Sequence, residues 1–252
     1  MSEECTLPQP ALSQPARIAN VFVSPAGAFT GLDRNASWWL AFVLSCVVSL
    51  GYFCTFEAKI GVAKTLSAQM SRNPQYAARV AKTSPEAQAR EMEIWAKARR
   101  VGMLCAIPGE LSFLLIGAAV LMATFNLGLG AQVRFGVAMA IVVYGNLPDI
   151  IRQGVGALLL WAGVKPEGFR NPLPSSLGVL VPVAQHRFLH RFLSVFDVFS
   201  LWAVVLIVLG FSIQGRVKRS TAIVIVLGWF LLYKLTFAGA LALQAHLLRL
   251  RS

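Results

Sequence analysis

The chain has 252 residues, of which 56% are hydrophobic and 13% charged, and its mean hydropathy is +0.64. These values exclude an ordinary soluble domain and an intrinsically disordered chain. Its 23 Lys and Arg residues against 11 Asp and Glu give a formal charge of +12. In a chain this apolar, that charge suits the anionic surface of a bilayer better than nucleic acid. The sequence therefore predicts an integral membrane protein that contacts the lipid bilayer and binds no nucleic acid.

The N-terminal segment is polar and rich in proline. Residues 1–16 include Pro8, Pro10 and Pro15, and such a composition cannot bury a core. We expect a disordered tail over 1–16 and a membrane domain over 17–252. Apolar residues in 17–34 indicate either a segment in the lipid headgroup region or a structured lead-in packed on the helices.

Long intervals without Asp, Glu, Lys or Arg predict the spanning helices. A helix needs about 20 residues to cross about 30 Å of hydrocarbon. The intervals predict an all-α, polytopic helical transmembrane bundle of about five spans. They lie near 38–56, 103–125, 133–163, 197–213 and 220–243.

The third predicted span is long for one crossing and short for two. Pro148 removes a backbone donor and disfavours helical geometry at Leu147. We interpret 133–163 as one crossing broken at Pro148, with a helical hairpin as the alternative. A single crossing gives five spans, which place the two termini on opposite sides of the membrane.

A polar segment, 57–102, joins the first two spans and has helical patterning. Apolar residues at helical spacing from Ile60 to Met70 continue the first span. Ser84 followed by Pro85 is typical of a helix start, with an N-cap and a first-turn proline. The sequence predicts a polar helical hairpin over 57–102.

The hairpin carries nine basic and four acidic residues, and Glu93 and Lys97 have the spacing of a favourable helical ion pair. Such a charge distribution indicates either a docking face for an acidic partner or a solvated face near phospholipid headgroups.

Four ionisable residues fall inside the apolar segments: Glu110, Asp149, Arg152 and Lys234. A charge in the bilayer interior costs several kcal/mol unless it is paired, hydrated or able to reach the interface. The two acids and two bases therefore predict an intramembrane polar cluster, with Asp149 and Arg152 on one helix face. The cluster serves either as a clasp that fixes the helix arrangement or as a polar site beside the broken helix.

Motifs for enzymatic chemistry are missing from the sequence. It has no phosphate-binding G-x-x-x-x-G-K-[ST] loop, no H-E-x-x-H zinc helix and no G-x-S-x-G nucleophile turn. We expect no catalytic residues, no cofactor and no metal site.

Several short motifs occur in an order that resembles a known membrane family. The segment 17–25 precedes the first span, which begins at Trp38-Trp39, and the phrase Phe196-Asp197-Val198-Phe199-Ser200-Leu201-Trp202 opens the fourth. Together they resemble the Yip domain (Ypt/Rab-interacting protein one) family over roughly 17–243. The residues that carry the resemblance are Pro25, Phe29, Trp38, Trp39, Pro148, Asp197, Phe199, Trp202 and Gly210.

The resemblance implies a five-span, non-enzymatic membrane protein. Eukaryotic members act in vesicle trafficking and bind Rab-type GTPases, whereas the short N-terminal segment here is similar to prokaryotic-type members of the cytoplasmic membrane. We expect a membrane scaffold or adaptor in membrane organisation or trafficking-like processes, with an unknown protein partner and a capacity for homo-oligomers. The alternative is a small-solute or ion permease that uses the charged cluster.

The orientation has two opposed indications. Five spans put 6 Lys and Arg residues on the N-terminal side and 15 on the other. The positive-inside rule then places the N-terminus outside the cytoplasm, whereas the resemblance to the eukaryotic family places it in the cytosol. We lean towards the charge count.

Overall fold

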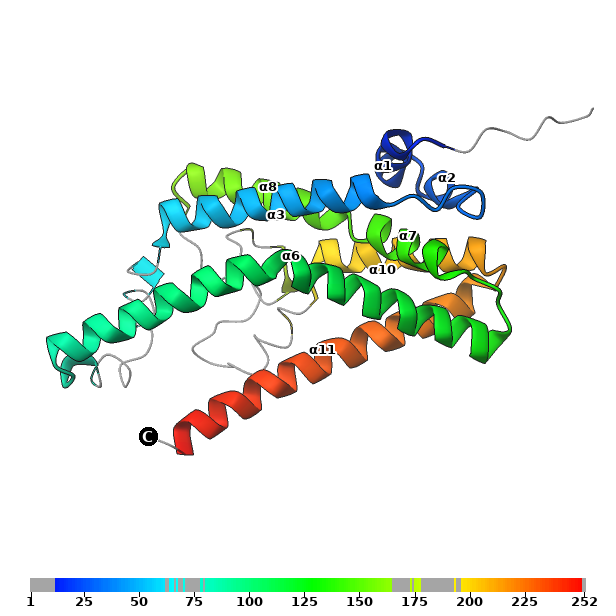
Figure 1. Ribbon diagram of the computed structural model, residues 1–252. Coiled ribbons are helices and arrows are strands. Elements are labelled where there is room, and N and C mark those ends of the chain that lie inside the picture. Colours follow the sequence, from blue (N-terminus) through cyan, green and yellow to red (C-terminus); the bar gives the residue numbers. More distant parts are fainter. Residues whose placement is uncertain are drawn as a thin grey trace, which may run out of the picture. The chain divides into compact units, whose positions relative to one another are not determined.

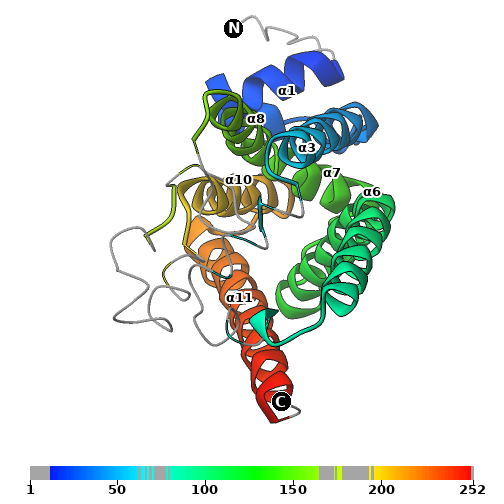
Figure 2. The same cartoon turned by 90° about the vertical axis from the view of Figure 1, so that its left-hand side faces the viewer.

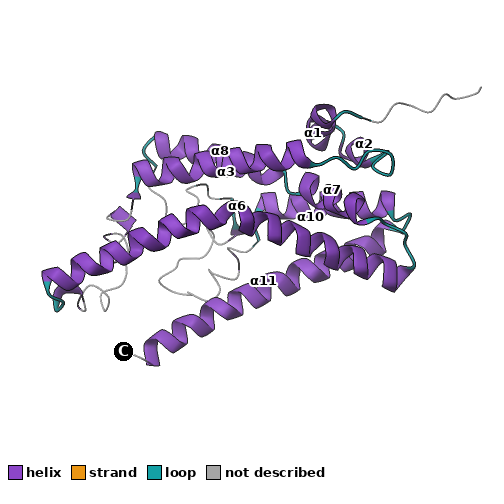
Figure 3. Ribbon diagram, viewed as in Figure 1, coloured by secondary structure: helices purple, strands orange, loops and turns teal. Residues whose placement is uncertain are grey.

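The computed structural model is built from helices (Figure 3). It describes residues 12–61, 64–65, 67, 70, 78, 80–164, 173, 175–177, 193 and 196–250. In these residues the one β interaction is an isolated bridge between Ser176 and Asp197. The path of the chain can be followed in Figures 1 and 2. The helices are α1 (Gln14–Val23), α2 (Pro25–Phe29), α3 (Trp39–Lys59), α6 (Pro85–Leu129), α7 (Phe135–Gly145), α8 (Pro148–Trp161), α10 (Val198–Gln214) and α11 (Arg219–Leu250).

Within the described residues four helical segments are long and apolar enough to cross a membrane: Trp39–Lys59, Pro85–Leu129, Phe135–Trp161 and Arg219–Thr236. The predicted all-α class with several membrane-length helices is therefore confirmed. The fourth predicted span corresponds to α10, an apolar helix of 17 residues. At 1.5 Å per residue α10 is about 25 Å long, slightly less than the hydrocarbon thickness of about 30 Å.

The chain divides into two compact units. Unit 1 comprises Met1–Phe42, Leu114–Leu147 and Leu201–Ser252, and unit 2 comprises Val43–Phe113 and Pro148–Ser200. Helices α3, α6 and α10 contribute residues to both units.

The core of unit 1 is formed where α10 meets α7 and α2. A Cβ atom added to Gly210 would lie 2.5 Å from Cγ2 of Ile141 and 3.0 Å from Cδ1 of Phe29, so glycine permits the close approach of these elements. Beside this contact the rings of Phe125 and Phe211 stack with centroids 4.6 Å apart. Small and aromatic residues thus bring three segments together that are distant in sequence.

A buried arginine stabilises the N-terminal part of unit 1. Arg17 on α1 is 1% exposed, and its Nη1 donates to the carbonyl oxygens of Ala28 and, at 3.0 Å, Thr30. These carbonyls end α2, where a positive charge interacts favourably with the helix dipole. Burial lowers the pKa of Arg17, and the adjacent Tyr144 partly offsets this effect.

The N-terminal tail is shorter than predicted. Helix α1 begins at Gln14, so residues 14–16 are helical, and residues 1–11 lie outside the described part of the chain. Pro15 stands in the first turn of α1, where the missing backbone donor is not needed. The side-chain oxygen of Gln14 accepts a hydrogen bond from the backbone N–H of Leu40 at 3.0 Å, so the start of α1 is fixed to the start of α3 within unit 1.

The predicted break in the third span is present. Helix α7 ends at Gly145 and α8 begins at Pro148. Because Pro148 cannot donate to the carbonyl of Tyr144, that oxygen accepts from the N–H of Leu147 instead, at 3.3 Å. The residues between the helices, Asn146 and Leu147, form a tight turn in place of a continuous helix.

The second helix of the predicted polar hairpin merges with the second predicted span. Helix α6 runs for 45 residues from Pro85, and Oγ of Ser84 accepts a hydrogen bond from the N–H of Ala87 at 3.3 Å, as expected of an N-cap. The predicted ion pair of Glu93 and Lys97 is present at 2.8 Å. In the first predicted helix of the hairpin, from Ile60 to Met70, residues 62, 63, 66, 68 and 69 lie outside the described residues.

Two charged contacts hold α3 to its neighbours in unit 2. Glu57 on α3 forms an ion pair with Arg99 on α6, and the guanidinium of Arg99 lies 5.2 Å from the ring centre of Phe56. Nζ of Lys59, at the end of α3, lies 3.8 Å from the ring centre of Trp161 on α8, a favourable cation–π contact.

Candidate functional site

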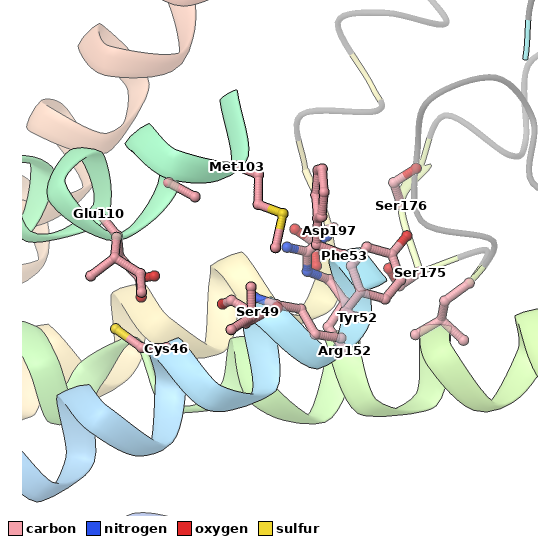
Figure 4. A pocket seen from close by; sticks show the side chains of 15 residues that line it. Cys46, Ser49, Tyr52, Phe53, Met103, Glu110, Arg152, Ser175, Ser176 and Asp197 are labelled. Atoms are coloured by element: carbon pink, nitrogen blue, oxygen red, sulfur yellow. The ribbon is translucent and has the colours of Figure 1, made fainter. Parts of the chain in front are cut away.

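Unit 2 contains a cavity of about 540 Å³ between α3, α6 and α8, with the segments around 173–176 and 197 completing its wall (Figure 4). Its volume lies within the usual range of small-molecule sites, about 300–1,000 Å³. The lining includes both apolar and ionisable side chains: Cys46, Ser49, Leu50, Tyr52, Phe53, Met103, Ala106, Ile107, Glu110, Arg152, Gln153, Leu173, Ser175, Ser176 and Asp197.

Helical periodicity explains how two helices line this cavity. The residues from α3 at 46, 49, 50 and 53 and those from α6 at 103, 106, 107 and 110 both follow the i, i+3, i+4, i+7 spacing of one helix face. Each helix therefore directs a continuous stripe of side chains into the cavity.

Of the predicted pair on α8, Arg152 lines the cavity and Asp149 holds it by an ion pair. Nε of Arg152 donates to Oδ1 of Asp149 at 2.6 Å, and Nε2 of Gln153 donates to Oδ2 at 2.5 Å. Both oxygens of Asp149 are therefore occupied. The negative charge of Asp149 offsets the positive charge of Arg152 at this end of the cavity.

A third carboxylate, missed in the sequence analysis of the cluster, lies close to Arg152. Oδ1 of Asp197 accepts a hydrogen bond from the N–H of Phe199 at 2.9 Å, and Oδ2 accepts one from the hydroxyl of Ser200. Asp197 thus caps the start of α10 while it lines the cavity. An acidic residue directly before an apolar helix is an N-cap signal, but nothing in the sequence places it beside α8.

Glu110 stands apart from this group. Figure 4 shows it on α6, separated from the group of Arg152, Tyr52 and Asp197. Within the part of the chain that the structure describes, its carboxyl makes no hydrogen bond and no ion pair, and it is only partly exposed. A carboxyl group without a cation partner therefore borders the cavity.

Lys234, the fourth member of the predicted cluster, belongs to unit 1. Its Nζ lies 5.3 Å from the ring centre of Phe230 and 6.0 Å from that of Tyr233 on the same helix, α11. The structure thus brings Glu110 and Arg152 to one cavity, with Asp149 hydrogen-bonded to Arg152. The inclusion of Lys234 in the cluster stays a prediction.

The ionisable groups at the cavity do not balance in charge. Among the described lining residues one cation, Arg152, accompanies the carboxylates of Glu110 and Asp197. Asp149 pairs with Arg152 from outside the lining, so these four side chains carry two net negative charges when all are ionised. Among the described residues no three His, Cys, Asp or Glu side chains are grouped as metal ligands.

The residues that carry the family resemblance have local structural roles. Pro25 and Pro148 are the first residues of α2 and α8, and Phe199 donates its N–H to the cap of α10. In unit 1, Phe29 is buried against Gly210, and Trp202 packs edge-on against Phe22 with centroids 5.7 Å apart. At the first span, Trp38 packs against Phe42, and Trp39 is exposed.

We expect Asp149 and Arg152 to be energetically coupled. Because each single change leaves a partly buried charge without its partner, Asp149→Ala and Arg152→Ala should each lower stability by about 1–2 kcal/mol. The double variant should lose less than the sum of the two. Thermal unfolding in detergent measures the cycle.

Glu93 and Lys97 form the control pair, because their side chains are 63% and 71% exposed. Their coupling should stay below about 0.5 kcal/mol. Additive losses at Asp149 and Arg152 would contradict the coupling.

No family model, no characterised protein and no solved structure matches the chain.

Proposed function

We propose that the protein is a five-span integral membrane scaffold or adaptor of the Yip-domain type, non-enzymatic and acting in membrane organisation or trafficking-like processes. The order of the motifs from Pro25 to Gly210 supports the family assignment. Its partners are the lipid bilayer and a protein that docks on the polar segment before the second span, and homo-oligomers are compatible with this role.

Helix α10 serves as the additional span in this proposal. Its 17 residues contain no Asp, Glu, Lys or Arg, and a helix of about 25 Å is accommodated by modest local thinning of the bilayer. The cap at Asp197 and the basic turn at Arg216 supply polar ends at both interfaces. Counted with the four longer segments, α10 brings the total to five.

The length of α6 is the observation that carries the scaffold function. Its 45 residues extend over about 67 Å, whereas about 20 residues cross the hydrocarbon. The charged N-terminal part, from Pro85 to Arg100, therefore extends beyond the apolar span as a helix. A helix that continues directly from a span is suited to present a docking surface for a partner close to the membrane.

The surface of this projecting segment, 85–100, combines charge with exposed apolar side chains. Ile94 is 66% exposed and Met92 is 40% exposed, although both precede the apolar span. Together with the basic excess of 57–102, these side chains suit an acidic amphipathic segment of a partner protein. The positive-inside rule assigns this more basic side to the cytoplasm.

Site-specific photo-crosslinking tests the docking role. With p-benzoylphenylalanine at Ile94, we expect one stoichiometric protein adduct in membranes of cells that contain the chain. The same probe at Val224, which is 71% exposed on the apolar helix α11, should give lipid adducts only. Replacing Arg90 and Lys97 by glutamate should reduce the protein adduct at least about fivefold, because the acidic partner is then repelled.

Two results would contradict the scaffold function. One is the absence of any protein adduct at position 94. The other is an adduct whose yield does not respond to the two charge reversals, since it would reflect non-specific proximity.

A second candidate function, a small-solute or ion permease, is favoured by the cavity in unit 2 with its charged lining. Solute flux into liposomes that contain the purified protein distinguishes it from the scaffold. Flux that is lost in Glu110→Gln while the adduct at position 94 persists would assign transport and docking to separate parts of the chain.

A further inference from the structure

We infer that the cavity of unit 2 binds a monovalent organic cation with an apolar body, an amine or a quaternary ammonium compound, through the carboxylate of Glu110. The inference concerns equilibrium binding. It requires neither the scaffold function nor transport. Neither of these two functions specifies an organic cation as the ligand of the cavity.

The position of Glu110 is the first step. It lies seven residues into the predicted span 103–125, which corresponds to about 10 Å along the helix axis. An ionised carboxyl at such a depth is costly unless a positive charge compensates it. In the described residues no basic side chain pairs with Glu110, and a positively charged ligand would supply the compensation.

The other charges of the cavity favour a cation over an anion. The guanidinium of Arg152 already donates to Asp149 at 2.6 Å, and the carboxylate of Asp197 lies at the same end of the cavity (Figure 4). An anionic ligand would meet the carboxylates of Glu110 and Asp197 and a cation that is already engaged. A cation would meet a net negative charge in surroundings of low dielectric constant, where electrostatic attraction is strong.

The remaining lining selects an organic cation rather than a metal ion. Leu50, Tyr52, Phe53, Met103 and Ile107 supply aromatic and apolar surface for the body of such a ligand. Hard metal cations require about six or more oxygen ligands. Glu110 is the one carboxyl at its end of the cavity, whereas a volume of about 540 Å³ accommodates an apolar body of aromatic size.

Three probes of nearly equal shape test the inference by calorimetry on the purified full chain in detergent. Benzyltrimethylammonium carries the positive charge, neopentylbenzene is its uncharged carbon isostere, and phenylmethanesulfonate carries a negative charge. We expect saturable one-to-one binding of benzyltrimethylammonium and affinities at least about tenfold lower for the other two. Equal binding of the neutral isostere would overturn the inference and identify an apolar cavity that takes any lipophilic molecule, lipid chains included.

Variants connect the binding to Glu110. Glu110→Gln removes the charge at constant size and should weaken binding of benzyltrimethylammonium at least about tenfold, while Asp33→Asn, an exposed carboxyl of unit 1, should leave it within about twofold. Ser49→Leu fills the cavity from α3 without a change of charge and should also abolish binding. If Glu110→Gln does not fold, Ser49→Leu decides. Unchanged affinity in either folded variant overturns the inference.

Discussion

Replacing Gly210 by valine is expected to lower the stability of the protein by at least about 3 kcal/mol. The first added carbon alone would lie 2.5 Å from Cγ2 of Ile141 and 3.0 Å from Cδ1 of Phe29, so the buried side chain of Ile141 or the backbone that carries it must shift. Since α2, α7 and α10 meet at this point, none of the three can move without loss of its other contacts. The loss should appear as a lower midpoint of thermal unfolding and a smaller monodisperse fraction after purification.

Gly228 on α11 provides the matched control. A Cβ atom added there meets no atom within 4 Å, so Gly228→Val should change stability by less than about 1 kcal/mol. Similar losses in the two variants would show that β-branching within an apolar helix, rather than the close contact of Gly210, determines the effect.

Replacing Arg17 by methionine is expected to cost about 2–4 kcal/mol. The carbonyl oxygens of Ala28 and Thr30 would lose their donor, and a buried acceptor left without a partner costs about 1–3 kcal/mol. Methionine fills a similar volume, so the loss reports hydrogen bonding and charge rather than a cavity. Thermal unfolding in detergent provides the measurement.

Arg17→Lys should give an intermediate loss, because lysine retains the charge but not the planar guanidinium. Arg90→Met, at an exposed position of α6, should stay within about 0.5 kcal/mol of the native chain. If Arg17→Met were equally mild, the contacts of Arg17 would contribute no net stability.

Local signals in the sequence predicted the features that depend on a few neighbouring residues. The break before Pro148 follows from a missing donor, and the start of α6 follows from the pairing of Ser84 and Pro85. The apolar intervals predicted the membrane-length helices, since their length and composition suffice. Helix α1 shows the opposite outcome, because the prolines of the tail suggested disorder although Pro15 is a favourable first-turn residue.

Features that depend on tertiary packing could not be predicted from local sequence signals. The cavity requires faces of α3, α6 and α8 to converge, and Tyr52 and Asp197 enter the site only through that convergence. The burial of Arg17 is equally invisible in the sequence, because its acceptors are backbone carbonyls, which every residue carries. Charge in apolar segments predicts one cluster of four residues, but the sequence does not indicate that Lys234 belongs to unit 1 and the other three to unit 2.

Helix α6 carries both the charged segment 85–100 and the cavity-lining residues that begin at Met103. The directions in which these two sets of side chains point are therefore related by the helical twist. Successive residues turn about 100° around a helix axis and advance 1.5 Å. One residue inserted between Lys97 and Val101 would therefore turn the charged segment by about 100° relative to the face that carries Met103 and Glu110. Seven inserted residues would restore the original direction to within about 20° and shift the segment outward by about 10 Å. The direction in which Ile94 points is therefore tied to the direction of Met103 on the same helix, so a change in the length of the intervening segment changes both the facing and the reach of the exposed apolar surface.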